Sequence, residues 1–173
     1  MIKVAKFGGS SCASAEQFQK VKDIVLSDKS RHYIVVSAPG KRASGDTKVT
    51  DLLYRLYDAV HDEERFQETL QEIRSRYQEI IDGLQLSFSL TEDFTRIEQD
   101  LKAGADRDYA ASRGEFLNAK LMAAYLGFQF IDSASCFFFN EDRSCDFEKT
   151  EEEIRAALKD VDYAVFPGFY GAN

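Results

Sequence analysis

The chain has 173 residues, 44% of them hydrophobic, so it can bury the core of one ordinary domain or of the larger part of one. Its 22 basic and 30 acidic residues give a formal net charge of −8, which argues against nucleic acid or an anionic membrane as the main partner. No apolar run approaches the roughly 20 residues of a membrane span, and the N-terminus lacks the build of a signal peptide, so we expect a cytoplasmic protein.

The cysteines and histidines indicate no metal site. Cys12, Cys136 and Cys145 are an odd number of cysteines without Cys-x-x-Cys spacing, so reduced thiols are expected rather than a disulfide framework. His32 and His61 fall in a strand entry and a charged helix tail, where solvated surface positions are typical. We therefore predict no metal ligand among these side chains.

A glycine-containing stretch follows the first predicted strand. Residues 6–11, Lys-Phe-Gly-Gly-Ser-Ser, come after the apolar run 2–5 and before a helix expected to begin near Ser14. Adjacent glycines can present bare N–H groups to a ligand, and a helix N-terminus favours negative charge, so the expected guest is a phosphate with Lys6 beside it. The stretch matches neither the Walker A spacing nor the dinucleotide fingerprint, so a plain tight turn stays open.

A second strand is predicted at 33–36, which completes a strand-helix-strand unit with parallel strands. It ends in Ser37-Ala38-Pro39-Gly40, and a polar, basic loop continues to Lys48. Because ligands gather at the carboxyl edge of open parallel sheets, this loop and the glycine loop should share a crevice. Thr50 is predicted as the N-cap of the next helix, and a ligand contact for it is as plausible.

The middle of the chain is helical. Residues 65–84 form a long amphipathic pattern and a second helix opens at Thr91, which we interpret as a helical insertion at about 62–104 with a structural role and no chemistry. A further helix runs from Asp106 to Gly127, where the glycine is expected to adopt a left-handed cap conformation. Within that helix Gly114 costs about 1 kcal/mol against alanine, so a close approach of another segment or a ligand is expected there. Its neighbour Glu115 is either a solvated carboxylate or part of a site.

The last third alternates short apolar runs with polar segments. Strands are predicted at 128–131, 136–139 and 163–166, and Thr150 has the position of a capping-box residue that opens a helix. The sequence stops shortly after the loop 167–171. Because that point lies just beyond a central-looking strand and leaves a sheet edge uncovered, we interpret the chain as truncated.

Five motifs in one order resemble aspartate kinases. They are Lys-Phe-Gly-Gly-Ser-Ser at 6–11, Val-Val-Ser-Ala at 35–38, Val-Thr-Asp-Leu-Leu at 49–53, Ser-Arg-Gly-Glu at 112–115 and Phe-Pro-Gly-Phe-Tyr-Gly at 166–171. The resemblance spans all 173 residues and implies an α/β fold, a three-layer αβα sandwich with a mainly parallel sheet. It also implies that the chain is the N-terminal, amino-acid-binding part of an amino acid kinase catalytic domain.

The resemblance implies transfer of the γ-phosphoryl group of ATP, with Mg²⁺, to the β-carboxylate of L-aspartate, the entry step to lysine, threonine and methionine. Lys6 would stabilise the transferring group, and Glu115 would pair with the α-ammonium of aspartate. The implied catalytic residues are Lys6, Gly8 and Gly9, and the implied substrate-binding residues are Ser10, Ser37, Thr50 and Glu115.

The chain also departs from the family pattern. Ser10 stands where threonine is more frequent, and Cys12 stands where an aliphatic residue is usual, so a thiol near the site is expected to confer reagent sensitivity. The Gly-Arg-Gly-Gly-Ser-Asp stretch, the nucleotide-binding half and the paired ACT domains are missing, so the fragment alone is expected to be inactive and its parent to be a homo-oligomer. The alternatives are another amino acid kinase, acting on a different carboxylate, a carbamate or a nucleoside monophosphate, and a non-catalytic anion- or amino-acid-binding module.

Overall fold

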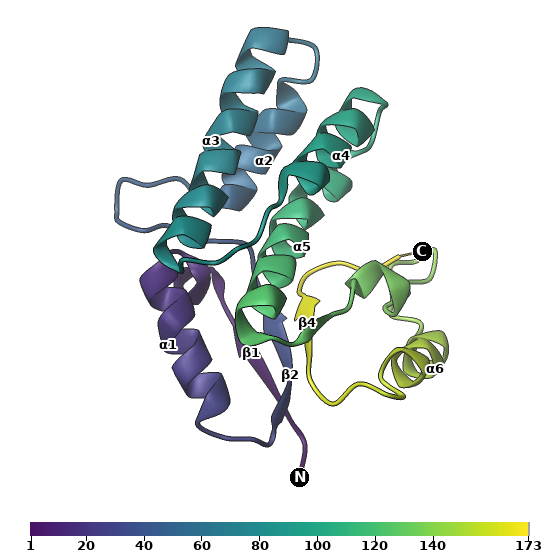
Figure 1. Ribbon diagram of the computed structural model, residues 1–173. Coiled ribbons are helices and arrows are strands. Elements are labelled where there is room, and N and C mark those ends of the chain that lie inside the picture. The colour runs from purple at the N-terminus through teal and green to yellow at the C-terminus, as the bar shows by residue number, and fades with distance from the viewer. Residues whose placement is uncertain (173) are drawn as a thin grey trace.

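The computed structural model describes residues 1–172, which form an α/β arrangement of helices around one sheet (Figure 1). In chain order the elements are β1 (Lys3–Phe7), the 3-10 turn η1 (Gly9–Cys12), α1 (Ala15–Leu26), β2 (Arg31–Val36), α2 (Val49–Asp58), α3 (Glu63–Gly83), α4 (Thr91–Lys102), α5 (Arg107–Leu126), β3 (Gln129–Phe130), the 3-10 turn η2 (Ser133–Ser135), α6 (Phe147–Ala157) and β4 (Ala164–Pro167).

The sheet has the strand order β1-β2-β4-β3, and every described pair of strands is parallel. The last strand of the chain, β4, therefore lies between β2 and β3, in agreement with its predicted central position. In the register, Val35 of β2 lies opposite Lys6 of β1 on one side and Phe166 of β4 on the other. The carboxyl ends of these three strands thus lie side by side, and the segments that follow them meet at one edge.

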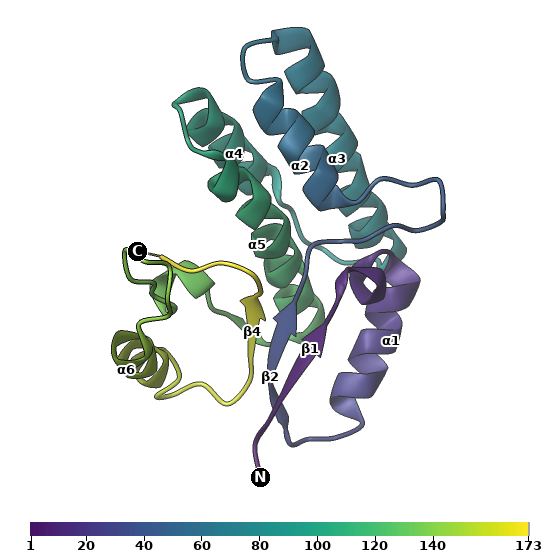
Figure 2. The ribbon, with the colours of Figure 1, turned by 180° about the vertical axis from the view of Figure 1, so that it is seen from behind.

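The two faces of the sheet are covered differently. Ile34, Val36 and Val165 point into the main core, which α1 and α5 share with the sheet. On the opposite face, seen in Figure 2, α6 and the segment 136–139 pack near β4, where Phe166 is buried. Val4 of β1 remains 64% exposed on that face. The predicted α/β fold with a parallel sheet is confirmed.

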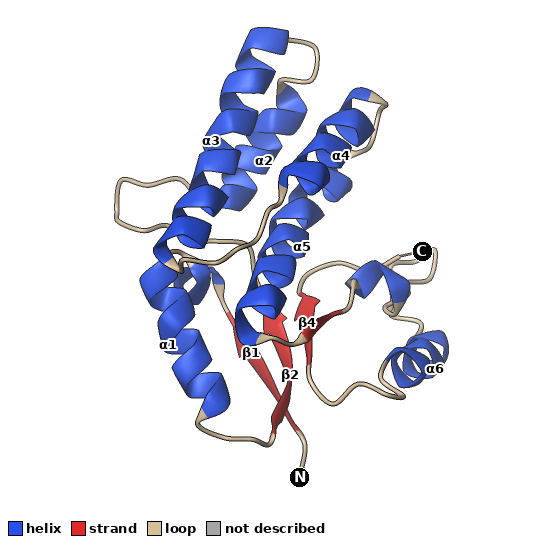
Figure 3. Ribbon diagram, in the orientation of Figure 1, coloured by secondary structure: helices blue, strands red, loops and turns tan. Residues whose placement is uncertain are grey.

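The helices α2, α3 and α4 extend beyond the carboxyl ends of the strands, together with the first half of α5 (Figure 3). The helix α5 packs against α2 and α4 there and against the sheet with its second half, so one long helix joins the helical part to the sheet. The helices predicted near 65–84 and from Thr91 are confirmed. None of the helices in residues 1–172 is long and apolar enough to cross a membrane.

Several predicted helix ends are confirmed by their hydrogen bonds. The Ser14 side chain accepts from the N–H of Gln17 at the start of α1, and Asp106 caps α5 in the same way through Tyr109. Gly127 ends α5 with φ 72°, the left-handed conformation that glycine adopts without steric cost.

Three local predictions are wrong. Thr50 is not a cap, because Lys48 holds the N-cap position of α2 and the N–H of Val49 already bonds to Pro39. Thr150 does not open a helix, because Asp146 caps α6 one turn earlier and the Thr150 hydroxyl accepts from the N–H of Phe138. The run 136–139 forms isolated bridges instead of a strand.

Candidate active site

The glycine loop connects β1 to α1 through a short 3-10 turn. Gly8 precedes η1, and α1 begins only at Ala15, so the amides of this loop belong to the 3-10 turn and not to the first turn of α1. Lys6 is exposed at the end of β1. A Cβ atom at Gly8 would meet nothing within 4 Å, which leaves one side of the loop open. A ligand can therefore approach the backbone between Lys6 and the 3-10 turn.

The second loop contacts the glycine loop directly, as predicted. The N–H of Gly40 donates to the carbonyl oxygen of Gly9 over 2.8 Å. A Cβ on Gly9 would lie 3.0 Å from the oxygen of Ala38, and a Cβ on Gly40 would lie 2.7 Å from the carbonyl carbon of Gly9. Two glycines are thus needed for the two backbones to approach this closely.

Glu115 of α5 points into the same region from the helical side. It is only 7% exposed, and its Oε2 atom has no hydrogen-bond partner among the described residues. Burial raises the pKa of Glu115, whereas the Ala38 N–H and the positive charge of Lys6 lower it. A buried carboxylate oxygen without a partner is the kind of group that a cationic ligand atom can satisfy.

Gly114 explains how α5 reaches this position. A Cβ there would lie 2.7 Å from the Cβ of Ala38 and 3.1 Å from Cδ1 of Leu53, so only glycine lets the helix close on the second loop and on α2. The predicted close approach at Gly114 is confirmed, and its neighbour is a chain segment. The same packing places Glu115 beside the backbone of Ala38.

The side chains of the three predicted hydroxyl residues have no contacts with other described residues that assign them to the site. Ser10 is exposed in η1, Ser37 is half-buried at the end of β2, and Thr50 is half-buried in the first turn of α2. The Ser37 N–H donates to the oxygen of Phe7 and so continues the ladder between β1 and β2. None of the three hydroxyls makes a hydrogen bond within residues 1–172 that would hold it away from a ligand, so their predicted contact with substrate stays a prediction.

Sequence reasoning missed Asn118. This side chain is fully buried, its Nδ2 donates to the carbonyl oxygen of Ser37 over 2.6 Å, and its Oδ1 has no partner among the described residues. It therefore fixes the end of β2 from α5. The available signal was its position three residues after Glu115, on the same face of the helix.

Cys12 lies beneath the glycine loop instead of on the site surface. Its side chain is 0% exposed, and burial raises the pKa of its thiol to about 12, while a hydrogen bond with Asn118 acts the other way. A buried, protonated thiol is a poor nucleophile, so the expected reagent sensitivity is not supported by its position.

Two further residues that sequence reasoning missed come from α3, in the predicted insertion. The buried Arg76 donates to the carbonyl oxygens of Gly40 and Thr47, each over 2.8 Å. Its neighbour Tyr77 donates its hydroxyl hydrogen to the carbonyl oxygen of Gly114 over 2.7 Å. The segment expected only to pack thus contacts both sides of the candidate site. Arg76 had a signal, because it falls on the helix stripe formed by apolar residues three and four positions away.

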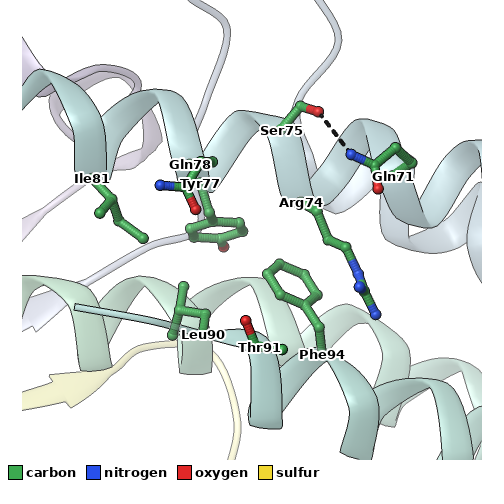
Figure 4. Close-up of a pocket in the computed structure, with 9 residues that line it drawn as sticks. All are labelled: Gln71, Arg74, Ser75, Tyr77, Gln78, Ile81, Leu90, Thr91 and Phe94. Carbon is green, nitrogen blue, oxygen red and sulfur yellow. Dashed lines mark hydrogen bonds between the residues drawn. The ribbon is translucent and has the colours of Figure 1, made fainter. Parts of the chain in front are cut away.

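A cavity of about 200 Å³ lies between α3 and α4 (Figure 4). Tyr77 and Phe94 share it, with their ring centroids 6.0 Å apart in an edge-to-face arrangement. The cavity is lined by Gln71, Arg74, Ser75, Tyr77, Gln78, Ile81, Leu90, Thr91 and Phe94. None of the predicted site residues lines it, so the candidate site is the edge where the two loops meet α5.

Known proteins resemble the chain over nearly its whole length. Aspartokinase 3 of Bacillus subtilis (strain 168) is 37% identical over 185 aligned residues, which cover 98% of this chain and 40% of that protein. The crystal structure of Clostridium acetobutylicum aspartate kinase matches with a TM-score of 0.92 and 42% identity over 98% of this chain and 39% of that one. E. coli aspartokinase III in complex with aspartate and ADP matches with a TM-score of 0.79 and 25% identity over 100% of this chain and 42% of that one.

The chain thus spans about two fifths of the length of these relatives. Its entire sequence, residues 1–173, matches the amino acid kinase family. The chain therefore belongs to the amino acid kinase family.

Proposed function

We propose that the protein to which this chain belongs is an aspartate kinase, which transfers the γ-phosphoryl group of ATP to the β-carboxylate of L-aspartate. The observation that carries the proposal is the buried Glu115, whose Oε2 has no partner among residues 1–172 and whose carboxylate is influenced by the backbone of Ala38 and the charge of Lys6. The proposal is supported by the relatives named aspartokinases and by the E. coli structure that contains aspartate and ADP.

Each residue has a defined part in this reaction. Glu115 accepts the α-ammonium group of aspartate, because a buried anion is stabilised by a charge-assisted hydrogen bond. A β-carboxylate oxygen then attacks the γ-phosphorus as the bond to the bridging oxygen breaks, and ADP leaves. The ammonium of Lys6 and the N–H groups of Gly8 and Gly9 stabilise the charge that develops on the phosphoryl oxygens.

Ser10, Ser37 and Thr50 complete the aspartate pocket in this proposal. Asn118 bonds to the carbonyl oxygen of Ser37 and so fixes the end of β2 from α5, and the Glu115 carboxylate lies near the backbone N–H of Ala38, the residue after Ser37. The pocket is thus formed by the ends of β1 and β2 on one side and by α5 on the other.

Magnesium enters with the nucleotide in this proposal, since in phosphoryl transfer the ion bridges the nucleotide phosphates. Within residues 1–172 no group of three or more histidine, cysteine, aspartate or glutamate side chains is placed to hold a metal ion. We therefore assign Mg²⁺ no ligand in this part of the protein and derive no step through it.

The test is a steady-state assay of the full-length protein with ATP and L-aspartate, read as ADP release. Glu115→Gln removes the charge while keeping the shape, and we expect the KM for aspartate to rise by about 10-fold or more, the loss typical of a charge-assisted hydrogen bond. The KM for ATP should stay within about twofold, because Glu115 does not face the nucleotide in the proposed arrangement. The control is Glu68→Gln, an exposed carboxylate on α3.

The alternatives predict different results. A kinase with another acceptor would release ADP with a different carboxylate, a carbamate or a nucleoside monophosphate and not with aspartate. A non-catalytic module would bind aspartate or an anion without turnover. We further propose that the full-length enzyme works in the cytoplasm as a homo-oligomer, with no nucleic acid or membrane partner, in keeping with the net charge of −8.

A further inference from the structure

Arg76 is an unusual side chain for the interior of a helical pair. It lies on α3, is 4% exposed, and makes an ion pair of 3.1 Å with Asp46 in addition to its two bonds to carbonyl oxygens. Burying a guanidinium is costly, and the Nε atom of Arg76 has no hydrogen-bond partner among residues 1–172, so a residue needed only for packing between helices would be apolar. The groups that Arg76 satisfies all belong to the loop 40–47.

Arg76 forms hydrogen bonds to both ends of that loop. Its Nη2 atom binds the oxygen of Gly40 where the loop begins, and its Nη1 atom binds the oxygen of Thr47 where the loop ends. The N–H of the same Gly40 bonds to Gly9 in the glycine loop. Gly40 therefore links Arg76 to the glycine loop, because its oxygen bonds to Arg76 and its N–H bonds to Gly9.

Tyr77 makes the equivalent contact on the other side of the site. Its ring is 0% exposed, and its hydroxyl bonds to the oxygen of Gly114, the residue immediately before Glu115. Consecutive residues of α3 thus hold the second loop and α5, the two structures between which aspartate would lie.

We propose that Arg76 is a positioning residue that, together with Tyr77, sets the distance between the loop 40–47 and Glu115. This inference rests on the proposed function. It assigns a role in the reaction to the helical insertion, for which the sequence suggested packing alone. Lysine cannot replace Arg76 fully, because a single ammonium cannot reproduce the planar fork that reaches two carbonyl groups seven residues apart.

The experiment compares Arg76→Met and Arg76→Lys with a matched control, Arg74→Met, in the full-length protein. Arg74 lies on the same helix and carries the same charge, but its guanidinium lies over the ring of Phe94, beside the cavity of Figure 4, and its ion pair is with Glu98 of α4 and not with the loop. For Arg76→Met we expect kcat/KM for aspartate to fall by about 10-fold to 100-fold, the penalty of a displacement near 1 Å in a reacting site. Arg76→Lys should lie between this variant and the wild type.

Two readouts separate positioning from general stability. The KM for aspartate should rise more than the KM for ATP, and hydrogen exchange should become faster at the amides of Gly40 and Val49 while the core amides of α5 keep their protection. Tyr77→Phe, which keeps the ring and removes one hydrogen bond, should raise the KM for aspartate by about threefold to tenfold. Arg74→Met should leave all these quantities within about twofold of the wild type.

The inference is overturned if folded Arg76→Lys and Tyr77→Phe both keep kcat/KM for aspartate within twofold of the wild type, or if Arg74→Met loses as much. If Arg76→Met does not fold, these two variants decide the question. A wild-type protein that does not phosphorylate aspartate overturns the proposed function instead, and the exchange rate at Gly40 then still tests whether Arg76 holds the loop.

Discussion

Replacing Gly40 with alanine tests whether the two loops of the site must touch. The new Cβ would lie 2.7 Å from the carbonyl carbon of Gly9 and 2.9 Å from the N–H nitrogen of Ser10, whereas ordinary contacts begin at 3.4 Å. Both neighbours are backbone atoms, so the loops must separate by about 0.7 Å, and overpacking of this kind costs about 1–3 kcal/mol. For a chain of this length, a loss of about 2 kcal/mol corresponds to a fall in Tm of roughly 4–8 °C.

The assay is urea and thermal unfolding of the 173-residue chain, with Gly45→Ala as the control. Gly45 lies in the same loop, and a Cβ there would meet nothing within 4 Å. Its replacement should leave the unfolding free energy unchanged or raise it by up to about 1 kcal/mol through the unfolded state. If Gly40→Ala were no less stable than Gly45→Ala, the contact between the loops would not exist in solution, and the site as described would be wrong.

Three further predictions concern titrating and reactive groups. Cys12, which is fully buried and whose thiol pKa is raised by that burial, should react with a thiol reagent at pH 8 only as fast as the chain opens or unfolds, because the reagent cannot reach it in the folded state; the less buried Cys145 should react first, and rapid native labelling of Cys12 in a peptide map would contradict its burial. Because burial raises the pKa of Glu115 above its ordinary value of 4.5, its ionisation lowers stability as pH rises from 4.5 towards the raised pKa, so Glu115→Gln should lose less unfolding free energy than the wild type between pH 4 and pH 7 in urea, and a variant that follows the wild-type pH profile would count against burial of this carboxylate. The pKa of Asp46 is held well below its ordinary value of 3.8, chiefly by Arg42, so this carboxylate stabilises the fold above pH 4 and the benefit is lost on acidification; Asp46→Asn should show a smaller loss of unfolding free energy between pH 5 and pH 2, and parallel curves would refute this.

The parts of the fold that local rules decide could be predicted from the sequence. Ser14, Asp106 and Gly127 mark helix ends through bonds within a few residues, so their signals are local and were confirmed. The meeting of the two loops followed from a general property of parallel sheets and was also confirmed.

The errors arose where distant contacts override local preference. Thr150 has a good capping pattern, but its hydroxyl is used by the N–H of Phe138, twelve residues away. The run 136–139 has the composition of a strand, yet the strand next to β4 on that side is β3, so no ladder is available to it.

The sequence predicted the local motifs of the candidate site, but it did not predict the α3 residues that hold those motifs in place. Glu115 could be proposed only through the resemblance, because one carboxylate in a helix carries no signal of its own. Arg76 and Tyr77 act on segments 36 and 37 residues away, and the charge-rich sequence around them resembles an ordinary solvated helix. The one available signal was the position of Arg76 on the apolar stripe of α3, three residues after Ile73 and four before Ile80.

The central place of β4 has a consequence for biosynthesis. Val36 pairs with Pro167, so the hydrogen bonds between β2 and β4 cannot form until residue 167 has been synthesised, about 130 residues after β2. Until then the nascent protein holds β1 and β2 with one side of β2 unpaired, next to the apolar Ile34 and Val36. Open strand edges of this kind recruit other chains, so synthesis that stops before residue 164 should yield an aggregating product, whereas β4, once made, pairs with β2 and removes this open edge.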